Sequence, residues 1–205
     1  MKYKEKIKIF LSFLIYIVAL YINEWFAINS PNIDQKPLFD RGHEVFPNII
    51  SGKIPDSILI VTMIYFLIRW AKTNISLLSN YFILVGMLFI IRVFVFMSTE
   101  IPSPLKKCNN KKYWDLNNIK WIFFQNDKTC IDNMFSGHTV HITAILLFTL
   151  YFSSFFIEKI IIVLMALITM ITLIWSRMHY TADVLVGFFL TIGWFLSGFH
   201  HYLHN

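Results

Sequence analysis

Charged residues are scarce in this chain: Asp, Glu, Lys and Arg together make up 15% of its 205 amino acids. A water-soluble domain of this length carries about 25%. Apolar residues take their place, at 57% of the chain, and the mean hydropathy is +0.60. This composition excludes a soluble globular domain and predicts an integral membrane protein.

Motifs for binding nucleic acids, metals or cofactors are also lacking. The formal net charge is +6, but no RNA- or DNA-binding motif accompanies the lysines. The positive excess therefore indicates orientation in a membrane and attraction to lipid headgroups. We expect no metal ion, no cofactor and no nucleic acid partner.

Long apolar runs predict six transmembrane helices, because a bilayer core requires about 20 apolar residues per helix. The second run is short, and Arg69 must extend its side chain to the interface. The fourth and fifth runs meet at Glu158 and Lys159 in a tight hairpin. The N-terminal run has no small-residue cleavage site, so we expect a retained span rather than a signal peptide. The expected spans are 7–27, 54–71, 77–97, 140–157, 160–176 and 181–199.

No internal repeat or linker divides the chain, so we expect one all-α polytopic membrane domain over residues 1–205. Six spans place both termini on one membrane face and the first, third and fifth loops on the other. The polar stretches 136–139 (SGHT) and 179–183 (HYTAD) precede the fourth and sixth spans on that same face. Their side chains are therefore expected to converge at one interface.

Lysines at the N-terminus favour cytosolic termini, because the first helix usually dominates orientation. A plain count of Lys and Arg over all the loops points the other way. With cytosolic termini, the motif-bearing loops face the exoplasmic or lumenal side. The four lysines concerned are Lys2, Lys4, Lys6 and Lys8.

The chain has only two cysteines, Cys108 and Cys130, and both lie in the third loop. In this orientation the loop is in an oxidising compartment, where a disulfide is expected to close it. Two unpaired thiols are the alternative.

His179 and Asp183 are four residues apart, a spacing that places both on one face of a helix. The carboxylate can accept a hydrogen bond from one ring nitrogen and leave the other unprotonated, as a nucleophilic histidine requires. His138 can supply the matching acid or base. Such a set can carry phosphoryl transfer without a metal.

Each of these motifs has a structural alternative. A His-x-x-x-Asp sequence is often a hydrogen-bonded pair at the interface, and Ser136 or Thr139 could cap the fourth span. His138, His141 and His179 could hold a metal, but no Cys, His or Glu spacing supports such a site. We favour catalysis, because ionisable groups at the edge of a membrane span are costly and tend to be functional.

The stretches CIDNMFSGHT (130–139) and HYTADV (179–184) resemble the third and fourth signature motifs of the sphingomyelin synthases, within the lipid phosphate phosphatase superfamily. The third motif of that family reads Cys-Gly-Asp, three residues, then Ser-Gly-His-Thr, and Ile131 replaces its glycine here. The fourth reads His-Tyr-Thr or His-Tyr-Ser, one residue, then Asp-Val. The matching residues are Cys130, Asp132, Ser136, Gly137, His138, Thr139, His179, Tyr180, Thr181, Asp183 and Val184.

Two upstream stretches extend the resemblance to about residues 37–190. The stretch KPLFD (36–40) is similar to the Pro-Leu-Pro-Asp of the first motif, with Phe39 replacing the second proline. The stretch 90–104 is similar to the second motif, with Ile101 in place of a leucine, and Cys108 matches a family cysteine. The other matches in the second motif are Arg92, Thr99, Pro102 and Pro104.

The resemblance implies a transferase that moves phosphocholine or phosphoethanolamine from a glycerophospholipid to ceramide and releases diacylglycerol. His179 would attack the phosphorus and form a phosphohistidine, and Asp183 would orient it. His138 would protonate the departing diacylglycerol and then deprotonate the acceptor hydroxyl. The partners would be a phospholipid donor and a ceramide-like acceptor, in the Golgi, the plasma membrane or another endomembrane.

Further residues are implied in substrate binding. Arg92 suits a phosphate oxygen, with anchoring at the interface as the alternative. Asp40, Glu100 and Asp132 would bind a cationic headgroup or steer His138, with solvation in a loop as the alternative. The matched motif residues Ser136, Gly137 and Tyr180 complete this expected set.

A lipid phosphate phosphatase is the strongest rival, because it shares the two-histidine chemistry but delivers water. Such enzymes usually carry Lys, six residues, Arg-Pro, and also Ser-Arg, five residues, His. The chain has no Arg-Pro pair, and Ser176 and Arg177 lie too close to His179. A non-catalytic scaffold or transporter would require four accidental resemblances. The residue before the second histidine is usually acidic in the family and is linked to headgroup choice; here it is Met178, which leaves the headgroup open.

Overall fold

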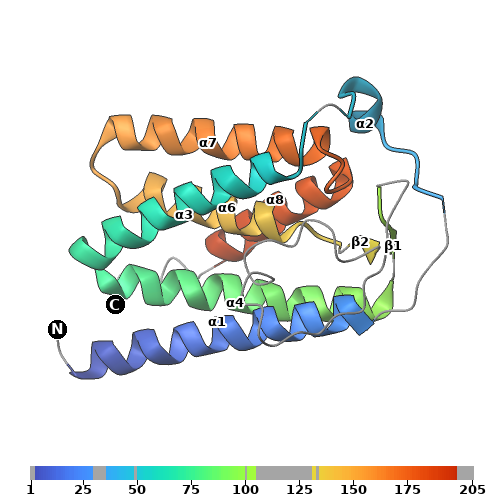
Figure 1. Cartoon of the computed structure of the whole chain (residues 1–205). Coiled ribbons are helices and arrows are strands. Elements are labelled where there is room, and N and C mark those ends of the chain that lie inside the picture. Colours follow the sequence, from blue (N-terminus) through green and yellow to red (C-terminus); the bar gives the residue numbers. More distant parts are fainter. Residues whose placement is uncertain are drawn as a thin grey trace.

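The computed structural model describes residues 3–29, 36–48, 50–99, 101–104, 131–132 and 134–197, which form seven helices and one two-stranded sheet. Figure 1 shows the long helices running side by side as a bundle, with α2 and both strands at one end. The elements are α1 (Tyr3–Asn29), α2 (Arg41–Val45), α3 (Lys53–Thr73), α4 (Ile75–Ser98), β1 (Ile101–Pro102), β2 (Ile131–Asp132), α6 (Gly137–Phe152), α7 (Phe156–Trp175) and α8 (Thr181–Leu196).

Among the described residues, four helices are long and apolar enough to cross a membrane: α1, α3, α4 and α7. Helices α6 and α8 are apolar but have 16 residues each, which is roughly 24 Å of helix. A hydrocarbon core is about 30 Å thick. The predicted polytopic all-α membrane protein is confirmed, while the described residues do not contain six spans of full length.

The turn between α6 and α7 lies earlier than predicted. Span 140–157 was expected to continue almost to Glu158, but α6 ends at Phe152 and Glu158 lies in the first turn of α7. The backbone of Ser153 is extended, and its Oγ accepts a hydrogen bond from Phe155 N at 3.1 Å. Serine side chains compete with helical hydrogen bonds in this way, so the helix stops there.

Glu158 ties the end of α3 to this turn. Its carboxylate accepts hydrogen bonds from Ser153 Oγ and, at 2.8 Å, from Tyr65 Oη. It also lies 3.5 Å from Nε of Arg69, whose side chain is 22% exposed. Arg69 is therefore paired with a buried carboxylate, and the expectation that its side chain extends to the interface stays a prediction.

Helix α4 is the most enclosed of the four long helices, with 67% of its apolar window buried against 28% for α1. A polar cluster inside the bundle joins it to its neighbours. His141 of α6 is 2.7 Å from Tyr81 Oη of α4 through Nδ1 and 3.3 Å from Tyr16 Oη of α1 through Nε2. Because both ring nitrogens are engaged, the cluster holds the first two turns of α6 against α4.

Gly187 lets α8 approach the start of α6. A Cβ at this position would lie 3.1 Å from Ser136 O and 3.3 Å from Thr139 Cβ. Nearby, the backbone N–H of Ser136 donates to Asp183 O at 3.1 Å. The N-terminal ends of the two short helices, which carry the two histidine motifs, therefore lie against each other.

We expect Gly187→Leu to lower the thermal stability of the protein in detergent, because overpacking such a contact costs about 1–3 kcal/mol or more. Gly193→Leu on the same helix is the matched control, since nothing lies within 4 Å of its Cβ position. The control should unfold close to the wild-type temperature. Equal melting temperatures for the two variants would contradict the close approach of α8 to α6.

Candidate active site

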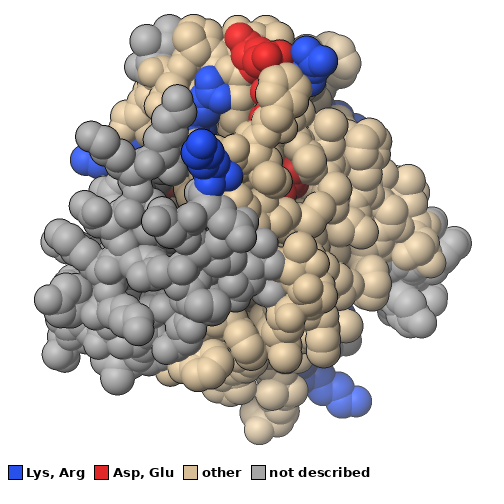
Figure 2. Space-filling model, turned by 90° about the vertical axis from the view of Figure 1, so that its right-hand side faces the viewer, with Lys and Arg blue, Asp and Glu red and all other residues tan. Residues whose placement is uncertain are grey.

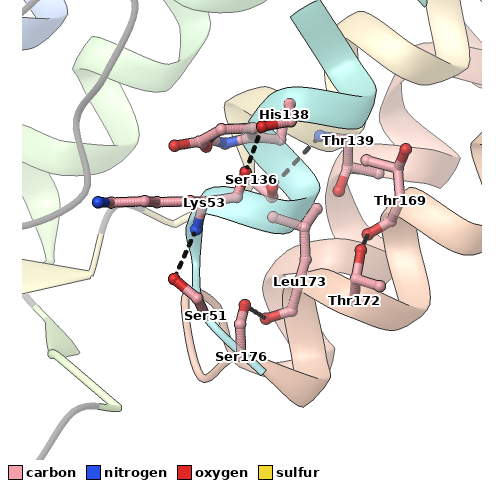
Figure 3. Close-up of polar contacts among 11 residues, drawn as sticks. Ser51, Lys53, Ser136, His138, Thr139, Thr169, Thr172, Leu173 and Ser176 are labelled. Atoms are coloured by element: carbon pink, nitrogen blue, oxygen red, sulfur yellow. Dashed lines mark hydrogen bonds and ion pairs between the residues drawn. The ribbon is translucent and has the colours of Figure 1, made fainter. Parts of the chain in front are cut away.

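The two motif histidines lie together at one end of the bundle. The ring centroids of His138 and His179 are 6.1 Å apart, and the rings are inclined at 62°. His138 is in the first turn of α6, and His179 lies two residues before α8 begins. Figure 3 shows His138 with Ser136 and Thr139 at the start of α6, beside the N-terminal part of α3. The expected convergence of the two stretches is present.

Asp56 of α3 is the partner of His138. Its Oδ1 lies 2.7 Å from Nε2 of His138, and the side chains are 3% and 15% exposed, respectively. No described residue makes a hydrogen bond with Nδ1 of His138. One ring nitrogen is therefore held by a buried carboxylate, and the other is left for a substrate.

Sequence reasoning missed Asp56. It lies 82 residues before His138, and no motif that we used includes it. A signal was nevertheless present, because Asp56 falls inside the expected span 54–71, where a carboxylate is costly unless it has a function or a partner.

His179 is buried and neutral. Burial lowers the pKa of its imidazole from 6.5 to about 3; the charge of Asp183 opposes this shift, and the charges of His138 and Arg92 assist it. At neutral pH the ring therefore has an unprotonated nitrogen, which is the state that a nucleophilic histidine requires.

Asp183 lies in the first turn of α8 and is 1% exposed. Its Oδ2 accepts a hydrogen bond from Tyr180 N at 3.0 Å. His179 precedes the helix because Tyr180, the N-cap residue, has an extended backbone. The expectation that His179 and Asp183 share one helix face is therefore wrong, although the carboxylate does act on the imidazole.

Arg92 is buried beside the histidines rather than anchored at the interface. It is 4% exposed, and its Nε donates to Phe135 O at 2.7 Å. The guanidinium lies 5.7 Å from the ring centre of Phe89. At Gly137 a Cβ would meet Phe89 Cζ at 3.0 Å and Arg92 Nη1 at 3.5 Å. The glycine of the motif thus makes room for the ring of Phe89, on which the arginine lies.

Three residues predicted to bind substrate hold the backbone of the site. Ser136, fully buried, caps α6 by accepting a hydrogen bond from Thr139 N at 3.2 Å. Tyr180 Oη donates to Pro102 O of β1 at 2.9 Å. Asp40 binds Thr181 through both of its carboxylate oxygens, each at 2.7 Å. Both carboxylate oxygens of Asp40 thus make a structural contact, and its expected headgroup contact stays a prediction.

Some predicted residues are not described. Glu100, Cys108 and Cys130 lie outside the described residues, so the headgroup contact and the disulfide stay predictions. Asp132 is described only through its backbone, which pairs with Ile101 across the two strands. Within the described ranges, no group of three or more His, Cys, Asp or Glu could hold a metal ion.

Exposed charges lie at this end of the bundle. Figure 2 views it end-on and shows acidic and basic side chains gathered near the upper edge of the picture. The exposed charged residues in α2, just before it and at the start of α3 are Lys36, Arg41, Glu44 and Lys53.

Comparison with known proteins fits this geometry. Residues 129–201, which include both histidines and Asp183, match the family described as PAP2 superfamily C-terminal. This stretch of the chain is thus similar to the PAP2 superfamily. The match covers the two short helices α6 and α8, whose N-terminal ends lie beside the two histidines, whereas Asp56 and Arg92 lie outside it.

Two curated proteins to which the chain is similar are named as ceramide phosphotransferases. A phosphatidylinositol:ceramide inositolphosphotransferase of Trypanosoma cruzi (strain CL Brener) is 33% identical over 138 residues, or 63% of this chain. A phosphatidylethanolamine:ceramide ethanolaminephosphotransferase of Trypanosoma brucei brucei is 29% identical over 124 residues, or 57% of this chain. The chain covers 38% of the length of each relative. The predicted relation to the sphingomyelin synthase-like enzymes is confirmed.

The low pKa of His179 predicts how the stability of the folded protein depends on pH. Between about pH 6.5 and about pH 3, the unfolded chain binds a proton at His179 and the folded chain does not. The free energy of unfolding therefore decreases as the pH falls through this range. His179→Gln removes the titration. Relative to this variant, the wild type should lose about 2 kcal/mol between about pH 7 and about pH 5.

Unfolding in detergent, followed over this pH range for both proteins, measures the difference. Above about pH 6.5 the two stability curves should run parallel, because His179 is then neutral in both states. Parallel curves down to about pH 5 would contradict a buried neutral His179.

Proposed function

We propose that the chain transfers a phosphate-linked headgroup from a glycerophospholipid to ceramide through a phosphohistidine at His179. One observation carries the proposal: two histidines lie 6.1 Å apart in unlike environments. His179 is buried and neutral, whereas His138 is bonded to the carboxylate of Asp56. The names of the relatives support this class of reaction.

In the first step, the unprotonated ring nitrogen of His179 attacks the phosphorus of the donor lipid. A P–N bond forms while the bond from phosphorus to the diacylglycerol oxygen breaks. His138 donates its proton to that oxygen, and Asp56 supplies the counter-charge for its imidazolium. Proton transfer by a positioned side chain typically contributes 10²–10⁴-fold to a rate.

In the second step, His138 takes the proton from the primary hydroxyl of ceramide. The hydroxyl oxygen attacks phosphorus, and the P–N bond breaks, which restores neutral His179. The products are diacylglycerol and a ceramide that carries the headgroup phosphate. Asp183 orients His179 throughout, and Arg92 faces the single negative charge of a phosphodiester.

A lipid hydroxyl, rather than bulk water, is the proposed acceptor. The side chains of the site are largely withdrawn from solvent: His179 is 7%, Arg92 4% and Asp56 3% exposed. A site withdrawn from solvent in this way excludes water and favours a hydroxyl that the membrane itself delivers.

The headgroup is the open part of the proposal. Phosphocholine and phosphoethanolamine are expected from the motif resemblance, and the relatives are named for ethanolamine and inositol. Phosphatidylcholine, phosphatidylethanolamine and phosphatidylinositol are therefore the three donors to compare. The proposal keeps the site on the exoplasmic or lumenal face and the termini in the cytosol.

We expect His179→Ala to abolish consumption of the donor lipid, because no phosphohistidine can form. Asp56→Asn should lower kcat by about 10²-fold, because the amide removes the counter-charge from His138. Ser57→Ala, an exposed neighbour on α3, is the matched control. Rates should be measured on purified folded protein with each of the three donors. Wild-type turnover in a folded His179→Ala variant would contradict the assignment of His179 as the nucleophile.

We expect a ceramide acceptor to direct most of the transferred headgroup into a new sphingolipid. Labelled donor lipid is incubated with and without saturating ceramide, and the products are separated into lipid-bound label, free headgroup phosphate and inorganic phosphate. Predominantly water-soluble phosphate at saturating ceramide would favour the phosphatase alternative. No consumption of any donor would favour a non-catalytic role.

A further inference from the structure

Helix α2 and the residues just before it form a clasp, residues 38–46, around the turn that carries His179, residues 176–181. We propose that His43 of this clasp is a positioning residue, which holds His179 in line with the phosphorus through its main-chain carbonyl. The inference rests on the proposed role of His179 and adds a third histidine to the reaction. No motif in the sequence pointed to His43.

The turn has a strained residue just before the nucleophile. Arg177 has a φ of 59°, in the left-handed region that is uncommon for residues other than glycine. Its guanidinium donates to the carbonyl of His43 and, at 3.3 Å, to the carbonyl of Phe46. The side chain of Arg177 is thus bound to the C-terminal end of α2.

The imidazole of His43 contacts the nucleophile residue itself. Its Nε2 lies 3.0 Å from the main-chain oxygen of His179, and His43 is 8% exposed. Because a carbonyl only accepts hydrogen bonds, Nε2 must carry the hydrogen. The bond restrains the peptide unit directly after the Cα of His179, and with it the direction of the imidazole.

The clasp also binds the last residue of the turn. Asp40 accepts hydrogen bonds from the backbone N–H and the hydroxyl of Thr181, and caps α2 by accepting from His43 N at 3.0 Å. A Cβ at Gly42 would overlap Thr181 Oγ1, so the glycine allows this close contact. Alternate residues of the turn, at 177, 179 and 181, are therefore each held by the clasp.

A function in positioning gives a reason for the presence of so short a helix. Helix α2 has five residues, too few to be stable by itself in water, so its conformation depends on docking. Two of its hydrogen bonds, both made by His43, end on the turn that carries the nucleophile. Misplacement of a reacting group by about 1 Å can cost 10²-fold in rate. The clasp therefore acts on the rate of the phosphorus attack rather than on binding of the lipid.

The test compares three variants of the full chain in detergent micelles: His43→Leu, which removes the donor; His43→Gln, whose amide keeps one; and Arg41→Ala. Arg41 is the control, since it lies on the same helix with its side chain 84% exposed.

Donor consumption is measured with phosphatidylethanolamine and phosphatidylinositol, and kcat is expressed per folded protein. We expect His43→Leu to lower kcat about 10- to 100-fold with KM unchanged, His43→Gln to recover most of it, and Arg41→Ala to match the wild type.

Equal kcat for His43→Leu and Arg41→Ala would overturn the proposal, as would a rise in KM with kcat unchanged. If His43→Leu yields no folded protein, Thr181→Val serves in its place, because it removes one clasp bond and keeps the side-chain shape. It should lower kcat in the same sense, and an unchanged kcat would overturn the proposal.

The readout is consumption of the donor, so the comparison holds whether the acceptor is ceramide or water. A wild type that consumes donor but makes no sphingolipid would contradict the proposed transferase and leave the His43 comparison intact. A wild type that consumes no donor would overturn both.

Discussion

Ionisable side chains inside an apolar bundle need partners, and this requirement governs much of the structure. An unpaired buried charge is far too costly to keep. Asp56 is bonded to His138, Glu158 is paired with Arg69, and the neutral His179 avoids a charge through its low pKa. The first pair and His179 lie at the site, whereas the second pair closes the turn between α6 and α7.

The chemistry proposed here follows from an asymmetry between two identical side chains. His138 keeps a carboxylate at one nitrogen and some exposure, which suits an acid and base. His179 is withdrawn from water and loses its proton, which suits a nucleophile. Two histidines in equal surroundings would titrate alike and could not divide these roles at one pH.

Helix length places this asymmetric pair within reach of lipid. The pairing of β1 with β2 and the hydroxyl of Tyr180 connect the segments around the site to α8. Since α6 and α8 are short and held closely together at Gly187, the histidines at their N-terminal ends lie side by side at one end of the apolar bundle.

The sequence by itself determined the membrane-protein class and the approximate helix positions, because the length of an apolar run is a local property. It also predicted that the His138 and His179 motifs meet, as they do, but from six spans, a number that the described residues do not confirm. Only the tertiary structure decided that Asp56 binds His138, that Asp40 binds Thr181 and that His43 reaches the carbonyl of His179. These contacts join residues 82, 141 and 136 positions apart. Hydropathy and motif spacing carry no information on which faces of distant helices meet, and side-chain packing settles that choice.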